Sequence, residues 1–264
     1  MKKLLSVFLC IIVLGAMLTA CAPADYAIEW ADPQLEHVVR EALGKPEGDI
    51  MASEMDIITR IHIGFDDSRL HFVDAQGGTL FTYPGEVSDL TAIPADFRHF
   101  RKLKQLMIAF SKIKDISALS ALTDLEYINL SNNSISDISP LRNLINLKEL
   151  HLANNKIKDI SPLRRLKTLQ HLMLAGNSIS DISPLGGLIY MWELSLDCNA
   201  IRDVSPLANM EHLHDLYLSE NDIRDISPLI KLTKLRRLDL VGMDIDAADI
   251  ASLRESLPGC AVNY

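Results

Sequence analysis

Residues 125–144 read Leu-Glu-Tyr-Ile-Asn-Leu-Ser-Asn-Asn-Ser-Ile-Ser-Asp-Ile-Ser-Pro-Leu-Arg-Asn-Leu, and the same frame restarts at Leu147, Leu169, Met191 and Leu213. The period is 22 residues. Three polar or turn-forming residues keep their phase in every copy: Asn133, Asn155, Asn177, Asn199 and Asn221; Asp137, Asp159, Asp181, Asp203 and Asp225; Pro140, Pro162, Pro184, Pro206 and Pro228. Such regularity indicates a repeat architecture in which each unit packs against its neighbours.

The frame continues on both sides in degraded form. It extends backward to Leu103, where Ser111 and Ala118 replace the Asn and the Pro, and forward to Leu235, where Met243 and Ile250 do so. Apolar residues at positions 1, 4, 6, 11, 14, 17 and 20 are expected to point inward and to stack on the neighbouring copies. The central L-x-L predicts a short strand that pairs in parallel with the next copy at about 4.8 Å.

The pattern L-x-x-L-x-L-x-x-N at this period resembles that of leucine-rich repeats, and the second half, I-x-D-I-S-P-L, is most similar to the internalin type of bacterial surface protein. The resemblance implies an α/β leucine-rich repeat solenoid with a parallel β-sheet on the concave face and short 3-10 or irregular helices on the convex face. A helical N-terminal cap and an α/β C-terminal cap should close its ends.

The recurrent polar residues are predicted to be structural. The Asn at position 9 follows the strand, where its amide can satisfy backbone groups that the turn leaves unpaired. Ser-Pro suits the first turn of a short helix, with Ser as the cap and Pro where no N–H donor is needed. We therefore assign none of the recurrent Asn, Asp or Pro residues to a binding or catalytic function.

The flanking segments are predicted to form caps. Residues 32–43 have helical apolar spacing, with Asp32-Pro33 as a start signal and Gly44 as a stop signal. Further expected elements are a short segment at 51–58, a first strand through Ile58, Ile61 and Ile63, a hairpin of Arg69–Val73 and Thr79–Thr82, a repeat-like Val87–Leu90, a helical segment Pro94–Phe100, a helix Ala247–Leu257 and an edge strand Cys260–Val262. With both ends capped in this way, the domain is expected to be complete.

The N-terminus predicts export and lipid anchoring. Lys2 and Lys3 precede an apolar stretch from Leu4 to Met17, which is typical of a secretory signal and too short for a comfortable membrane span. The following Leu18-Thr19-Ala20-Cys21 resembles a bacterial lipobox, which implies that Cys21 becomes the first mature residue and carries a diacylglycerol. An ordinary signal peptide with a chance Cys is the alternative. Two or three acyl chains would hold the protein at a membrane, while one would not.

The expected organisation is therefore a lipoprotein signal peptide at 1–20, a lipidated Cys with a short tether at 21–31, a helical cap and first strand at 32–63, an irregular insert or degenerate repeat at 64–100, the repeats at 101–242 and a C-terminal cap at 243–264.

Composition narrows the function classes. The chain has 264 residues, 48% of them hydrophobic and 23% charged, which excludes disorder. Its formal net charge of −9 becomes about −11 without the two leader lysines, and it has no dense Lys/Arg run. An acidic surface repels phosphate backbones, so we expect no nucleic-acid partner.

Cysteine and histidine usage predicts no cofactor and no metal. Cys10 leaves with the signal and Cys21 would be acylated, so only Cys198 and Cys260 remain as thiols. Their positions lie about three strand spacings apart, roughly 14 Å, whereas a disulfide needs Cα atoms within about 7 Å. Cys198 at position 8 could be a reactive thiol, but the frame fixes no Lys or His beside it, and a small neutral filler is the preferred interpretation.

The concave strand positions 3 and 5 vary in every copy, and this variation predicts a recognition surface. The candidate partner-binding residues are Tyr127, Glu149, His151, His171, Met173, Trp192, Glu193, Asp215, Tyr217 and Arg237. Aromatic and Met residues favour a protein interface, and the alternating acidic residues favour a partner carrying basic residues. Trp192 lies at position 2 and could instead pack against Tyr190. A sheet face that is merely solvated is the alternative for the whole set.

Three further interpretations remain open at this point. Glu149, His151, His171, Glu193 and Asp215 could bind a divalent cation or act as acid and base. An enzyme could use Asp66, Asp67, His71, Asp74 and His99 of the insert, although these form no recognisable motif. The chain could also be a structural component of the envelope. The preferred hypothesis is a monomeric, non-enzymatic, lipid-anchored protein of the bacterial cell surface that binds an unidentified protein, with adhesion or host contact as possible roles.

Overall fold

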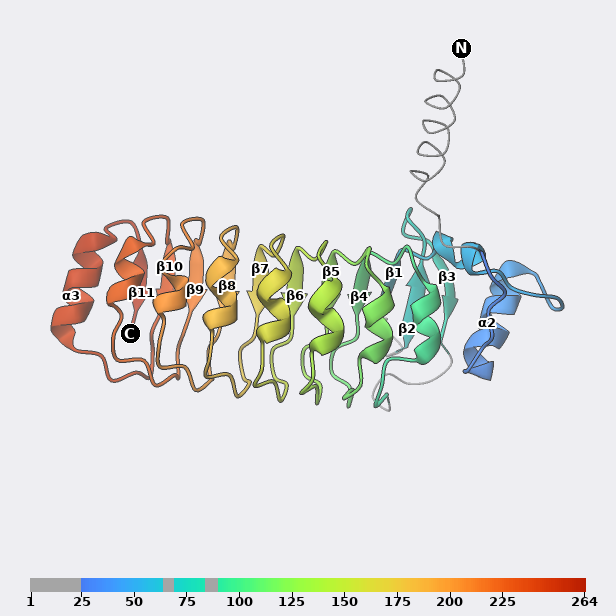
Figure 1. The fold of residues 1–264 in the computed structure, drawn as a ribbon, viewed down its shortest axis with the longest axis horizontal. Coiled ribbons are helices and arrows are strands. Elements are labelled where there is room, and N and C mark those ends of the chain that lie inside the picture. The colour runs from blue at the N-terminus through green and yellow to red at the C-terminus, as the bar shows by residue number, and fades with distance from the viewer. Residues whose placement is uncertain (1–24, 64–68, 84–89) are drawn as a thin grey trace, which may run out of the picture.

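Strands of successive repeats lie side by side in one sheet of eleven strands, in the order β11-β10-β9-β8-β7-β6-β5-β4-β1-β2-β3 (Figure 1). The computed structural model describes residues 25–63, 69–83 and 90–264. The predicted signal segment, Cys21, Asp66, Asp67 and residues 87–89 of the repeat-like stretch lie outside these residues. The repeat strands are β4 Gln105–Met107, β5 Tyr127–Asn129, β6 Glu149–His151, β7 His171–Met173, β8 Glu193–Ser195, β9 Asp215–Tyr217 and β10 Arg237–Asp239.

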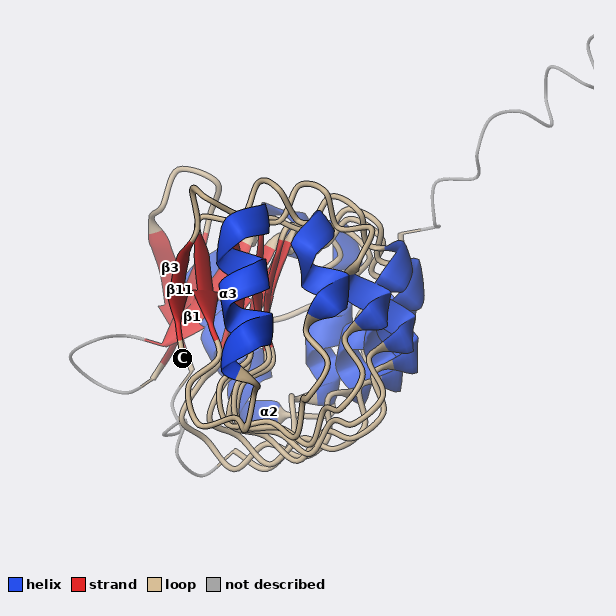
Figure 2. Ribbon diagram, turned by 90° about the vertical axis from the view of Figure 1, so that its left-hand side faces the viewer, coloured by secondary structure: helices blue, strands red, loops and turns tan. Residues whose placement is uncertain are grey.

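Adjacent repeat strands pair in parallel without any shift of register. Position 4 always opposes position 4, as in Leu150 with Leu172 and Leu194 with Leu216. Figure 2, viewed along the coil, shows the strands on one side and the helices on the other, with loops closing each turn. The α/β solenoid predicted from the 22-residue frame is confirmed.

One hydrophobic core runs along the whole coil, from Ile28 to Leu257. The side chains at positions 1, 4 and 6 are fully buried in the central copies, for example Leu169, Leu172 and Leu174. Since each repeat contributes only one thin layer, the core is continuous only because neighbouring copies stack.

The Asn at position 9 performs the predicted structural role. Asn155 donates from Nδ2 to the carbonyls of Leu130 and Leu152, both at 3.0 Å, and its Oδ1 accepts the N–H of Ile135 at 2.9 Å. The same set recurs at Asn177. Each Asn therefore bonds to backbone groups of its own turn and of the preceding copy.

The convex face carries short 3-10 helices: η4 Ser117–Ala121, η5 Ser139–Asn143, η6 Ser161–Arg165, η7 Ser183–Gly187, η8 Ser205–Leu207 and η9 Ser227–Lys231. The prediction that Ser caps these helices is wrong. Asp159, two residues before Ser161, accepts the Ser161 N–H at 2.8 Å and its hydroxyl at 3.0 Å. Because the Ser is already the first helical residue, the recurrent Asp supplies the acceptor, while the Pro does lie in the first turn as predicted.

Position 8 adopts a left-handed backbone in every copy. Its φ angles are positive at Phe110, Asn132, Asn154, Cys198 and Glu220 and at the glycines Gly176 and Gly242. Cys198 is exposed there and is a free thiol. Cys260 is also a free thiol, as the predicted spacing requires.

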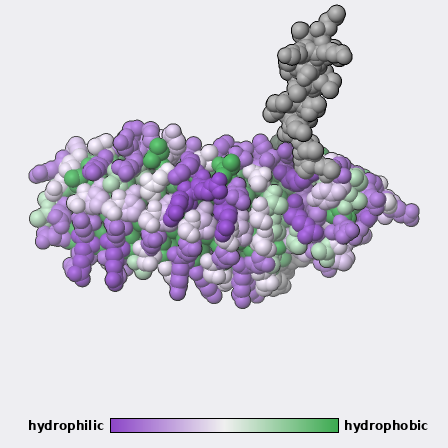
Figure 3. All heavy atoms as spheres, viewed as in Figure 1, coloured by the Kyte–Doolittle hydropathy of each residue, from purple (hydrophilic) through white to green (hydrophobic). Residues whose placement is uncertain are grey.

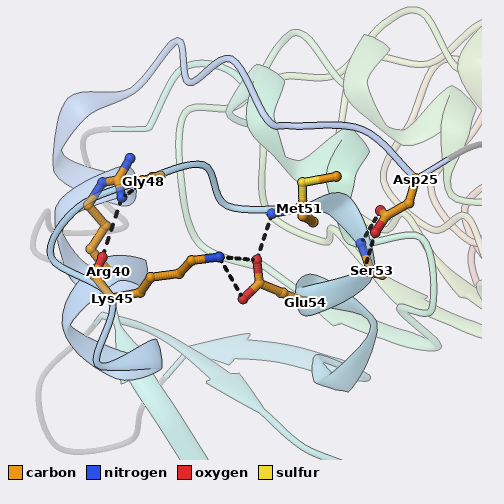
Figure 4. Close-up of polar contacts among 7 residues, drawn as sticks. All are labelled: Asp25, Arg40, Lys45, Gly48, Met51, Ser53 and Glu54. Atoms are coloured by element: carbon orange, nitrogen blue, oxygen red, sulfur yellow. Dashed lines mark hydrogen bonds and ion pairs between the residues drawn. The ribbon is translucent and has the colours of Figure 1, made fainter.

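The N-terminal cap consists of helix α2 (Pro33–Leu43) and 3-10 helix η1 (Ala52–Ile57). Figure 4 shows how polar contacts fix it: the Glu54 carboxylate accepts the N–H of Met51 at 2.7 Å and contacts Lys45 Nζ at 2.9 Å. Asp25, at the start of the described chain, accepts the N–H of Ser53 at 2.9 Å. The described chain therefore begins bound to the cap.

The segment between the cap and the repeats extends the sheet. Strand β1 (Arg60–Ile63) pairs in parallel with β4, as its L-x-x-L-x-L pattern predicts, and antiparallel with β2 (Leu70–Val73). Strands β2 and β3 (Thr79–Thr82) form the predicted hairpin, and 3-10 helix η3 (Ala95–His99) takes the place of a convex helix.

The C-terminal end is covered by helix α3 (Ala247–Ser256) and by strand β11 (Ala261–Asn263), which pairs with β10. Both elements were predicted, within one or two residues. Within residues 25–63, 69–83 and 90–264, none of the helices has the length and apolar character needed to cross a bilayer.

Candidate binding surface

The concave face, defined by positions 3 and 5 of the seven repeat strands, presents a non-repeating set of side chains. In β5, β6 and β7 both positions are half-buried and flank a fully buried Leu or Ile. This alternation follows from the pleat of a strand, which sends successive side chains to opposite faces. The structure therefore places nine of the ten candidate residues on one continuous face.

The aromatic side chains on this face are half-buried, and Tyr127 packs against a neighbouring ring. The Tyr127 ring lies 5.6 Å from the His151 ring, centroid to centroid. Burial raises the pKa of the Tyr127 and Tyr217 hydroxyls above their ordinary value, so both remain protonated donors at neutral pH. Met173 is half-buried two strands along from Tyr127. These side chains can supply contact area to a macromolecular ligand.

The ionisable candidates form separate pairs and do not converge on one point. Glu149 contacts His151 Nε2 of its own strand at 2.7 Å. His171 Nδ1 lies 3.3 Å from Glu193, one strand further along. No group of three or more His, Cys, Asp or Glu side chains that could hold a metal ion is found in the part of the chain that the structure describes.

Asp215 and Arg237 form the tightest pair, with Arg237 Nε 2.6 Å from Asp215 Oδ1. This hydrogen bond to the guanidinium lowers the pKa of Asp215, and the carboxylate in turn raises the pKa of Arg237. Asp215 is nearly buried while Arg237 is exposed. The C-terminal end of the concave face therefore holds a fixed charge pair, with the cation accessible to solvent.

Trp192 is the one candidate that lies off the concave face. It precedes β8, and its ring stacks on His214 of the next copy, with centroids 3.8 Å apart and planes 10° from parallel. Its stacking partner is thus His214 and not Tyr190, whose ring faces His212 at 6.0 Å. Trp192 remains 46% exposed.

Three of the insert residues that an enzyme might use, His71, Asp74 and His99, belong to the described chain, and each contacts different groups. His71 Nδ1 contacts Thr82 Oγ1 at 3.2 Å, Asp74 accepts N–H groups of its own hairpin turn, and His99 is buried against Tyr26. Each of these described side chains contacts its own element or a neighbouring one. A surface depression of about 730 Å³ lies elsewhere, at the turns after β8, β9 and β10, and its lining includes Arg202, Asp222, Arg224, Asp225 and Asp244.

Two parts of the surface were missed by sequence reasoning. His62 of β1 and His71 of β2 stack with centroids 5.6 Å apart and prolong the concave face beyond β4. The parallel pairing of β1 with β4 places His62 opposite Met107, at position 5 of the frame, whereas His71 lies there only through the antiparallel pairing of β1 with β2, which the frame does not encode. Tyr190, His212 and His214 join Trp192 at the edge of the coil, and their frame positions 22 and 2 were an available signal.

Comparisons with known proteins agree with the fold. The sequence matches the family of Leucine Rich repeats (2 copies) over residues 101–143, 123–165, 145–187 and 211–253. No curated protein is significantly similar to the chain in sequence.

Solved structures of similar shape include two internalins of Listeria monocytogenes. The structure of inlF has a TM-score of 0.61 at 30% identity, over 92% of this chain and 59% of its own. The structure of internalin C2 has a TM-score of 0.64 at 28% identity, over 88% of this chain and 93% of its own. The chain thus spans less than two thirds of the inlF chain.

A third structure is similar in fold alone. It is the leucine-rich repeat ectodomain of the Arabidopsis thaliana receptor kinase GASSHO1/SCHENGEN3, solved in complex with CASPARIAN STRIP INTEGRITY FACTOR 2. Its TM-score is 0.53 at 22% identity, over 67% of this chain and 25% of its own.

Proposed function

Because the chain is an internalin-like leucine-rich repeat protein, we propose that it is a lipid-anchored protein of the bacterial cell surface that binds a protein partner through its concave face. Repeat proteins of this type commonly mediate protein–protein interaction. A binding role, as opposed to an enzymatic or purely structural one, is supported by one observation above all: on each repeat strand the inward positions 4 and 6 are always apolar, whereas the concave positions 3 and 5 change from copy to copy.

The chemistry of that face favours a partner with aromatic or apolar anchors and basic residues. Tyr127, Met173 and Tyr217 offer partly exposed area, and side chains of this kind dominate interface energetics when a partner buries them. Tyr127 in β5 and Tyr217 in β9 are four strands apart, about 20 Å, a width suited to one protein domain. Glu149 and Glu193 lie between them, so salt should weaken the association.

The anchor at Cys21 and the extracytoplasmic location rest on the N-terminal sequence. Metabolic labelling with a fatty acid analogue tests the anchor by itself: Cys21→Ala should abolish the label and leave the protein soluble or as an unprocessed precursor. A labelled Cys21→Ala protein would exclude this anchor without bearing on the concave face.

The concave face is tested by a partner screen with the mature chain, followed by Tyr127→Ala and Tyr217→Ala. Each variant should weaken binding at least about tenfold, since a buried interface Tyr contributes more than about 1.4 kcal/mol when it is a hot spot. Ile230→Ala, which truncates an exposed side chain on convex helix η9, is the matched control and should bind normally. If both Tyr variants retain full affinity with unchanged stability, the concave face is not the interface.

A further inference from the structure

A second surface departs from the repeat pattern, along the edge where the chain turns from the convex helices into the strands. We call it the strand-start edge and define it by frame positions 21, 22 and 2 of the seven copies, which lie between Arg101 and Arg236. In most copies these positions are polar. Four exposed apolar or aromatic side chains interrupt them: Ile145 at 53% exposure, Ile189 at 44%, Tyr190 at 58% and Trp192 at 46%.

The aromatic residues of this edge are held in place by their neighbours. Trp192 stacks on His214 and Tyr190 lies against His212, each in the next copy. A side chain fixed in this way loses little conformational entropy when a ligand covers it. Figure 3 shows the convex side as mainly hydrophilic, with isolated hydrophobic residues near its upper edge.

The charge of the strand-start edge is opposite to that of the whole chain. It carries seven basic side chains and three acidic ones, in a chain whose formal net charge is −9. The basic residues are Arg101, Lys102, Lys104, Lys148, Lys167, Lys234 and Arg236, and the acidic ones are Asp124, Glu126 and Glu211. The opposite edge, at positions 8 to 13 of the same copies, carries six basic and ten acidic side chains. The two edges therefore differ in sign.

The distribution of ion pairs concentrates the excess charge near the aromatic residues. Toward the N-terminus, Asp124 pairs with Lys102, and Glu126 pairs with both Lys104 and Lys148. Toward the C-terminus, the part of the edge from Lys167 to Arg236 contains three basic residues, which are Lys167, Lys234 and Arg236. It contains one acidic residue, Glu211. The exposed rings thus lie between cations.

The described chain starts close to the same edge. Hydrogen bonds from the hydroxyl and the N–H of Ser53 in the cap lower the pKa of the Asp25 carboxyl, and the positive charge of Arg101, the first basic residue of the edge, adds a smaller effect in the same direction. In Figure 1 the described chain likewise begins at the upper edge of the coil. Three residues lie between Cys21 and Asp25, so at most about 14 Å of extended chain joins them. A lipid on Cys21 would hold this edge next to the bilayer.

We propose that the strand-start edge lies against an anionic phospholipid surface, with Ile189, Tyr190 and Trp192 at the level of the headgroups and Lys167, Lys234 and Arg236 beside lipid phosphates. The proposal rests on the lipid anchor proposed above. Trp and Tyr favour the membrane interface, and cations near it are attracted by anionic lipids. The coil would then lie along the membrane with its acidic edge turned away, and the concave face would remain accessible from the side.

Binding to vesicles tests the edge without the lipid anchor. The continuous core from Ile28 to Leu257 lies wholly inside residues 25–264, so this fragment keeps every residue of that core. It should co-sediment at low salt with phosphatidylcholine vesicles that contain phosphatidylglycerol, and not with phosphatidylcholine alone. In a Trp30→Phe background, the emission of Trp192 should shift to the blue on binding.

Charge reversal provides a matched control. Lys234→Glu with Arg236→Glu should weaken vesicle binding at least about tenfold, while Lys156→Glu with Lys158→Glu, on the opposite edge, changes the net charge equally and should leave binding unchanged. The proposal is overturned if the fragment does not co-sediment with anionic vesicles, or if the two double variants bind these vesicles equally well. It is also overturned if the emission wavelength of Trp192 does not change on binding. Partner binding through Tyr127 and Tyr217 is a separate measurement, so either proposal can fail alone.

Discussion

At the scale of the residue, side chains on the two faces of a strand contribute very differently to the free energy of unfolding. Leu172 is fully buried, whereas its neighbour His171 is half-exposed. Leu172→Ala should lower the free energy of unfolding by about 2–5 kcal/mol, because it removes buried methyl groups and leaves a cavity. His171→Ala loses only a partly exposed contact with Glu193 and should cost under about 1 kcal/mol. Urea unfolding followed by circular dichroism measures both.

The comparison is internal, since the two side chains belong to the same strand and the same copy. Comparable losses for the two variants would show that the inward and outward phases have been assigned to the wrong positions.

Single residues also show where sequence reasoning stops. The role of Asn155 was predictable because an amide both donates and accepts and recurs at a fixed phase. The left-handed backbone at position 8 was harder to see. Asn154 and Gly176 tolerate it, but Phe110 and Cys198 occupy the same phase and conceal the signal.

At the scale of the element, the cap of the 3-10 helices provides the second prediction. Asp159→Ala should lower the free energy of unfolding by about 1 kcal/mol, because the N–H of Ser161 loses its acceptor. Ser161→Ala keeps that N–H bond and should cost less than half as much. Asp159→Asn retains a side-chain oxygen and should fall between the two. Thermal or urea unfolding of the three variants ranks them.

The ranking separates the two capping schemes. If Ser161→Ala proves the more damaging variant, the Ser hydroxyl is the cap and the Asp acceptor is incidental.

Elements with strong local signals were predicted well, and those that depend on distant pairing were not. Helix α2 starts where Asp32 accepts the N–H groups of Gln34 and Leu35, and it ends at Gly44 with φ 60°. Both boundaries are therefore determined by residues next to the helix in the sequence. The hairpin of β2 and β3 was also predicted from its Gln76-Gly77-Gly78 turn. Its antiparallel addition to β1 was not predicted, because nothing within the hairpin specifies its neighbour.

At the scale of the whole molecule, the repeat frame fixes which side chains share a face but not how they pair. It placed Glu149, His171, Glu193 and Asp215 on the concave face, where a cation site was conceivable. The side-chain torsions then decide that Glu149 turns along its own strand to His151 while Asp215 turns to Arg237. The aromatic and basic strand-start edge also follows from the frame, because it consists of positions 21, 22 and 2. It becomes apparent only when these positions in successive copies are known to lie side by side.

The connection between the cap and the coil depends on a buried histidine. His99 in η3 contacts Tyr26 Oη through Nδ1 at 2.9 Å, and Arg98 Nε donates to its Nε2 at 3.3 Å. Asp96, fully buried nearby, accepts the N–H groups of Ala31 and of the residue that follows it. Tyr26 is thus joined to η3 through the His99 imidazole, and the N–H groups of residues 31 and 32 are joined to it through the carboxylate of Asp96.

Burial, reinforced by the positive charges of Arg98 and Arg101, lowers the pKa of His99 below its ordinary value of 6.5, although Asp96 acts in the opposite direction. Because the unfolded chain then binds the proton first, the stability contributed by neutral His99 is complete above pH 6.5 and decreases as the pH falls below it, down to the lowered pKa. The protection factor of the Ala31 amide, which is the exchange rate relative to that of an unfolded chain at the same pH, should therefore fall in mild acid before the protection factors in the central repeats do. His99→Gln should remove this dependence, whereas His37→Gln, at an exposed site on α2, should retain it. An equal fall of the protection factors in the cap and in the central repeats would contradict the assignment to His99.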